Sequence, residues 1–154
     1  MISVHSGNLD GSGLAFAIVA SRFNGEIVER LVDGAVEAFT ANKVDPADLS
    51  VWWVPGAFEI PSVCQALLRK RKVQAVVALG CVIRGETDHY QHVSAAAVRG
   101  IAQVSREFST PIMFGVLTCD TMEQALARAG SGVDNHGYSG ALAAIQTATL
   151  IKQL

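Results

Sequence analysis

Four short apolar runs, each followed by a longer stretch of helical periodicity, constrain the fold of this 154-residue chain more than any other feature of its sequence. The runs are rich in Val, Ile and Ala and contain few polar residues, as strands do when both faces of a parallel sheet are buried. They cover residues 15–20, 51–54, 75–83 and 112–117. Strands that alternate with helices predict an α/β protein in which helices cover a four-stranded parallel sheet.

The stretches between the runs carry apolar residues at intervals of three and four. Ile27, Leu31, Ala35 and Phe39 would share one face of a helix over residues 25–42. The same pattern predicts helices over residues 60–71, 88–108, 122–129 and 137–153.

The helices and strands suggest one domain over residues 14–154, preceded by an N-terminal segment, residues 1–13. Within that segment, Ile2-Ser3-Val4 has some strand character. An isolated strand needs a partner, which we expect in a neighbouring subunit.

The composition limits the classes of function. Half of the residues are apolar and the mean hydropathy is +0.32, which predicts that part of the surface meets another subunit. No apolar run approaches the ~20 residues of a membrane span. The net charge of −2, with one short basic cluster at residues 69–72, argues against nucleic-acid binding. Three cysteines without a C-x-x-C pair, and an N-terminus unlike a signal peptide, favour a soluble cytoplasmic protein with reduced thiols.

Candidate site residues follow the four expected strands, at the edge where open α/β sheets bind ligands. The most informative of these stretches is Gly85-Glu86-Thr87, which leads into a helix whose first N–H groups lack partners and attract phosphate. His89 would stand on the first turn of that helix and could exchange protons with a leaving phosphate or an attacking amine. A lone His is more often a surface or capping residue, but the adjoining loop favours the functional interpretation.

Other candidates have both a functional and a structural interpretation. Phe23 and Phe58 could stack on a planar heterocycle or belong to the core. Glu59 could bind a polar ligand or cap a helix. Arg128 could contact a phosphate or be a solvated side chain.

Several known ligand-binding motifs do not fit. His89, His92 and Glu86 could share a helix face, but no second cluster has metal-ligand spacing, so we expect no metal. Gly11-Ser12-Gly13 precedes the first strand and cannot be a dinucleotide-binding turn. A P-loop lysine is lacking, and residues 21–24 do not include the acidic residues of a receiver domain.

Four motifs, in order along the chain, resemble those of the lumazine synthase family. They are IVASRFN at 18–24, VPGAFEIP at 54–61, ALGCVIRGET at 78–87, and FGVLT at 114–118 followed by Glu123-Gln124-Ala125. The resemblance runs from about Leu14 to the C-terminus. It implies a flavodoxin-like three-layer sandwich and, without a cofactor, the condensation of 5-amino-6-ribitylaminouracil with 3,4-dihydroxy-2-butanone 4-phosphate.

The resemblance also implies how the pyrimidine would bind. Phe23 matches the aromatic residue that stacks on the ring. Val82 and Ile83 match the strand end that binds the ring through its backbone, and Ala57-Phe58-Glu59 matches the segment that binds the ribityl chain.

At the other end of the site, Gly85-Glu86-Thr87 and Arg128 match the phosphate-binding residues, and His89 matches the proton-transfer residue. Phe114 and Arg128 match residues that the family supplies from the adjacent subunit. His136 stands where the family commonly has a lysine near the phosphate, so the charge at this position would depend on pH.

The shared site implies a permanent assembly, in this family a homopentamer or twelve pentamers in a 60-subunit shell, with riboflavin synthase as a possible cargo. The compact segment 128–137, without an insertion, favours the shell. Two other functions remain open: a non-enzymatic lumazine- or flavin-binding or shell-forming protein, and a flavodoxin-type electron carrier. Glu59, His89 and Arg128 argue against the non-enzymatic binder.

Overall fold

A four-stranded parallel sheet with the strand order β2-β1-β3-β4 forms the centre of the molecule. The computed structural model describes all residues, 1–154. The strands are β1 (Phe16–Ser21), β2 (Leu49–Val54), β3 (Ala75–Ile83) and β4 (Ile112–Cys119). This order matches the flavodoxin-like arrangement and confirms the predicted α/β class.

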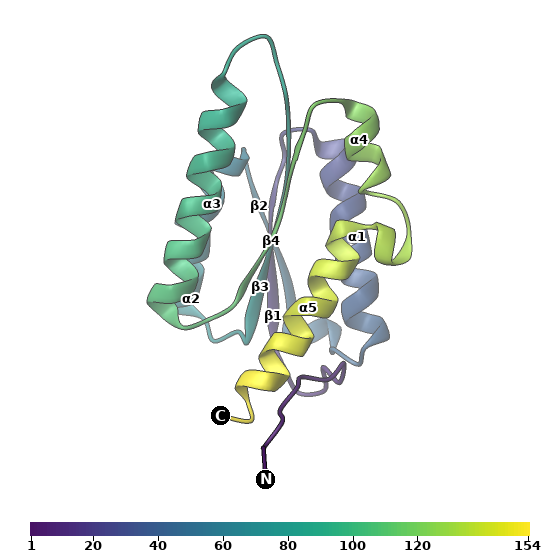
Figure 1. The fold of residues 1–154 in the computed structure, drawn as a ribbon, viewed down its shortest axis with the longest axis vertical. Helices are drawn as coiled ribbons and strands as arrows, with labels where there is room; N and C mark the ends of the chain where they lie inside the picture. Colours follow the sequence, from purple (N-terminus) through teal and green to yellow (C-terminus); the bar gives the residue numbers. More distant parts are fainter.

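Helices cover both faces of the sheet and complete three layers (Figure 1). One face carries α1 (Gly25–Ala41) and α5 (His136–Ile151), and the other carries α2 (Ile60–Lys70) and α3 (His89–Phe108). The short α4 (Met122–Ala127) follows β4. None of these helices is both long enough and apolar enough to span a bilayer.

The central strands separate two apolar cores. All six residues of β1 are buried, and their side chains alternate between the faces. Phe16 and Ile18 pack with α1 and α5, whereas Ala17 and Val19 pack with α2 and α3. The prediction of strands buried on both faces is therefore confirmed for β1, and β3 is similarly buried except at its last residue.

The edge strands are longer than predicted. β2 begins at Leu49 rather than at residue 51, and β4 continues to Cys119 rather than ending at residue 117. Edge strands are partly exposed, so polar residues such as Ser50 and Thr118 belong to them. A prediction from uninterrupted apolar runs therefore makes these two strands too short. The other predicted boundaries differ from the structure by at most two residues.

Glycines permit close contacts between the helices. A Cβ atom at Gly100 of α3 would lie 2.6 Å from Cγ of Pro61 in α2, so these two helices approach each other closely at this glycine. The N-terminal segment contacts α5, where the N–H of Asn8 donates to Oγ1 of Thr149 at 2.9 Å. Ile2-Ser3-Val4 is exposed and forms no strand within this chain.

Candidate active site

β1 and β3 are neighbours in the sheet, but the helices that follow them, α1 and α3, lie on opposite faces (Figure 1). The two chain segments therefore separate at the carboxyl ends of these strands. Such a topological switch point is where ligands bind in open α/β sheets. A cleft of about 610 Å³ lies here, a size that suits a small-molecule ligand. It is lined by Phe23, Pro55, Gly56, Ala57, Phe58, Glu59, Cys81, Val82, Ile83, His89, Tyr90, His92 and Val93.

The turn after β1 places Phe23 at the cleft. The N–H of Arg22 donates to the carbonyl of Val54 at 2.8 Å, and the N–H of Phe23 donates to the carbonyl of Pro55 at 3.1 Å. These bonds extend the pairing of β1 and β2 beyond the strands themselves. Phe23 remains 71% exposed, so the residue belongs to the surface of the cleft and not to the core.

The second wall is the turn of 3-10 helix Ala57–Glu59 that leads from β2 into α2. Oε2 of Glu59 accepts a hydrogen bond from the N–H of Gly56 at 3.0 Å, so the carboxylate caps this turn. The capping interpretation of Glu59 is therefore confirmed, and ligand binding by Glu59 stays a prediction. Phe58 is 63% exposed at the cleft.

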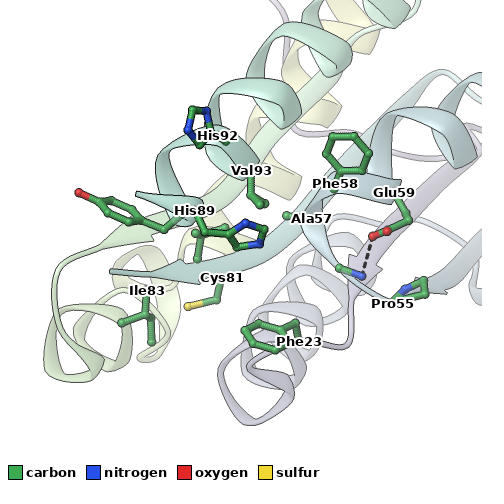
Figure 2. A pocket seen from close by; sticks show the side chains of 13 residues that line it. Phe23, Pro55, Ala57, Phe58, Glu59, Cys81, Ile83, His89, His92 and Val93 are labelled. Carbon is green, nitrogen blue, oxygen red and sulfur yellow. Dashed lines mark hydrogen bonds between the residues drawn. The ribbon is translucent and has the colours of Figure 1, made fainter. Parts of the chain in front are cut away.

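His89 is the first residue of α3, as its sequence position predicted. Its imidazole turns into the space between Phe23 and Phe58 (Figure 2). Its backbone N–H donates to Oγ1 of Thr87 at 3.4 Å, so the preceding loop is connected to the helix start. The exposed Gly85-Glu86-Thr87 stretch adjoins the cleft and does not line it.

Besides Gly85-Glu86-Thr87, three further predicted residues lie outside this chain's cleft. Phe114 is 47% exposed on β4. Arg128 follows α4 and His136 begins α5, and the two are adjacent because the N–H of His136 donates to the carbonyl of Arg128 at 2.8 Å. The guanidinium of Arg128 donates to the carbonyl of Gln124 at 3.0 Å. The remaining predicted residues, apart from Gly85-Glu86-Thr87, line the cleft together.

Several lining residues were missing from the predicted site. Val93 follows His89 by four residues, about one helical turn, which was the available signal. Tyr90 directly follows His89, and His92 was considered only as a metal ligand. The His92 ring lies on the next turn, farther from Phe23 (Figure 2). Cys81 also lines the cleft and was not among the predicted site residues. It is buried, and desolvation raises its pKa to about 11, with a smaller contribution from Cys119.

These features define a class: a flavodoxin-like α/β protein with an apolar small-molecule cleft, bordered by aromatic rings and an imidazole, at its switch point. The family model of 6,7-dimethyl-8-ribityllumazine synthase matches residues 13–152. The chain is 44% identical to the 6,7-dimethyl-8-ribityllumazine synthases of two Clostridium kluyveri strains over 153 residues, 99% of either chain. The chain belongs to the 6,7-dimethyl-8-ribityllumazine synthase family. It is an enzyme of the transferase type in riboflavin biosynthesis.

Proposed function

We propose that the chain condenses 5-amino-6-(D-ribitylamino)uracil with 3,4-dihydroxy-2-butanone 4-phosphate to 6,7-dimethyl-8-ribityllumazine, releasing phosphate and water. The observation that carries this proposal is the convergence of Phe23, Glu59 and His89 on one cleft from three separate elements. Residues 14–154 would act as one catalytic domain that needs no cofactor and no metal.

The cleft suggests how the pyrimidine binds. Its ring would stack on the exposed face of Phe23, and its polar edge would meet the backbone of Val82 and Ile83 at the end of β3. The ribityl chain would extend along Ala57-Phe58-Glu59, where Glu59 is already held by the N–H of Gly56. An apolar cleft with few polar groups suits a planar heterocycle with a hydroxylated tail.

The butanone phosphate would bind at the start of α3. Gly85-Glu86-Thr87 precedes the N-terminus of this helix, whose dipole favours an anion. Arg128 would add a guanidinium, and His136 would lie nearby, because the backbones of these two residues are hydrogen-bonded.

The reaction would begin when the pyrimidine amine attacks the ketone and forms an imine with loss of water. Phosphate then departs, and ring closure with loss of a second water completes the bicyclic product. Most of the rate enhancement would come from holding both reactants in register. His89, beside the reacting atoms, would transfer protons to the leaving phosphate or from the attacking amine.

Part of the site would come from a second subunit. Phe114, Arg128 and His136 do not line the cleft of their own chain, which fits a site completed by a neighbour. Exposed apolar side chains in the segment that also contains Arg128, namely Met122, Leu126 and Val133, favour a permanent interface. The assembly would be a cytoplasmic homopentamer, with twelve pentamers closing into a shell that can hold riboflavin synthase.

The direct test mixes purified protein with both substrates and follows the fluorescence of the lumazine product. We expect product to form far faster than in the same mixture without protein. Equal rates would favour the non-enzymatic binder. A preparation that carries tightly bound flavin mononucleotide would instead favour the electron carrier.

A further inference from the structure

The two central strands diverge at the edge of the cleft. β1 and β3 pair from Phe16 and Ala75 as far as Ala20 and Leu79, whereas β3 continues to Ile83 against β4. The carbonyl of Cys81 lies just beyond the last of these pairs. It accepts a hydrogen bond of 2.8 Å from Nδ2 of Asn24, so a side chain replaces the strand pairing that ends here.

The backbone of Asn24 has a defined conformation and accepts hydrogen bonds of its own. It has φ 54° and ψ 43°, the left-handed conformation that Asn adopts more readily than most residues. Its carbonyl accepts hydrogen bonds from the N–H groups of Ile27 and Val28, at 3.0 and 3.2 Å, and so begins α1. One residue thus turns the chain, starts a helix and connects the turn to β3.

This connection lies between two groups that face the cleft. Phe23 immediately precedes Asn24 and is held on its other side by Pro55. On β3, the N–H of Arg84 donates to the carbonyl of Cys119, so the backbone groups of Ile83 point the opposite way, toward the place where β1 has ended. The side chain of Asn24 is hydrogen-bonded to the carbonyl of Cys81. The backbone groups of Ile83 therefore stay available to bond a ligand.

We propose that Asn24 is a positioning residue for the pyrimidine substrate, an inference that rests on the proposed function. A planar ring that stacks on Phe23 while its edge meets the Ile83 backbone needs a constant separation between these two groups. The Asn24 side chain sets that separation, since it bridges the turn that carries Phe23 to the strand that carries Ile83. It touches neither reacting atoms nor phosphate.

The test compares Asn24→Gly with Ser109→Gly. Glycine adopts the left-handed conformation without strain, so Asn24→Gly removes only the amide bridge. Ser109 is also left-handed, with φ 48°, but it is exposed at the end of α3, at the opposite edge of the sheet. We expect the KM for the pyrimidine, and the Kd of the fluorescent product, to rise about threefold to tenfold in Asn24→Gly, the effect of one hydrogen bond. The KM for the butanone phosphate should stay within twofold, and Ser109→Gly should leave all of these constants unchanged.

Asn24→Asp sharpens the comparison, because it keeps the size and turn preference but places an anionic acceptor against the carbonyl of Cys81. It should raise the pyrimidine KM more than Asn24→Gly does. Thermal unfolding of each variant establishes that it is folded. A pyrimidine KM in Asn24→Gly within twofold of the unsubstituted protein, or an equal rise for both substrates, would overturn the positioning role. Formation of product by the unsubstituted protein tests the proposed function separately.

Discussion

His89 stands at the first turn of α3 with its imidazole in the cleft, where a change of side chain affects chemistry more than folding. His89→Ala should lower kcat about 100- to 10,000-fold, because proton transfer contributes that much on top of orientation. Turnover should still exceed the uncatalysed rate. The control His5→Ala removes an exposed imidazole outside the site and should have wild-type kinetics in the same fluorescence assay. A His89→Ala kcat within threefold of wild type would remove His89 from the mechanism.

His136 stands where the resemblance to the family implies a lysine, and a lysine there should bind the phosphate more tightly. The ammonium of a lysine is a fixed positive charge that attracts phosphate, whereas a neutral imidazole offers at most one hydrogen bond. His136→Lys should therefore lower the KM for the butanone phosphate at about pH 8, and the KM for the pyrimidine should hardly change. An unchanged KM for the butanone phosphate would place His136 outside the site.

The cysteines should be unreactive in the folded protein. Burial raises the pKa of Cys64 to about 12 and that of Cys81 to about 11, and it also raises the pKa of Cys119. The reactive thiolate is therefore scarce at pH 7 to 8. Iodoacetamide should modify all three thiols rapidly in denaturant and hardly at all in its absence, as measured by mass spectrometry. Rapid native labelling of Cys81 would show that the cleft opens more widely than its burial implies.

At this scale, residue type and position after a strand were enough to predict that Phe23, Glu59 and His89 meet at one cleft. They were not enough to predict Cys81 as a lining residue, because its apolar context is also that of a core strand. The bridge from Asn24 to Cys81 could not be predicted either. It depends on where β1 and β3 diverge, which local patterns do not encode.

Among the elements, the connection from α4 to α5 depends on the side chain of Asn135, which is 2% exposed. Its Nδ2 donates to the carbonyls of Arg30 and Gly130, each at 2.9 Å. Its Oδ1 accepts from the N–H groups of Gly137 and Tyr138 at 2.8 and 3.1 Å. One side chain therefore attaches the loop to α1 and caps α5.

Asn135→Ala should lower the free energy of unfolding by roughly 2–4 kcal/mol, because buried backbone groups lose their partners. Asn42→Ala removes a single side-chain bond, from Nδ2 to the carbonyl of Ala38, and should cost less than about 1.5 kcal/mol. Urea denaturation measures both values. Equal losses in the two variants would contradict a special role for Asn135.

The helices were predictable because each buries one regular face, and their ends were found to within two residues. The edge strands were each predicted two residues too short, since the burial of β2 and β4 depends on what covers them. The hydrogen bonds of Asn135 could not be predicted from the sequence either, because they join segments that are far apart in it. Its glycine partner Gly34 is distant in sequence, yet a Cβ there would lie 2.4 Å from Oδ1 of Asn135.

For the whole molecule, the proposed shared site predicts complementation between inactive subunits. His89→Ala and Arg128→Ala homo-oligomers should each be impaired. After the two are unfolded and refolded together in equal amounts, about one quarter of the sites should contain both intact residues, because neighbours assemble at random around a symmetric ring. Activity that stays at the level of the separate variants would indicate that each chain forms its site alone.

Light scattering of the unsubstituted protein should give the mass of a pentamer or of 60 subunits, and a monomer would contradict both.

The strand order also governs how this chain acquires its structure during synthesis. β1 lies in the interior of the sheet, yet it is synthesised before the other three strands, and its partner β3 follows more than fifty residues later in the sequence. Until then one edge of β1 stays unpaired, and an exposed strand edge promotes aggregation. A nascent chain that ends after β2 would therefore be a target for chaperones. The non-local pairing of β1 with β3 would make the completion of the sheet a slow step in folding.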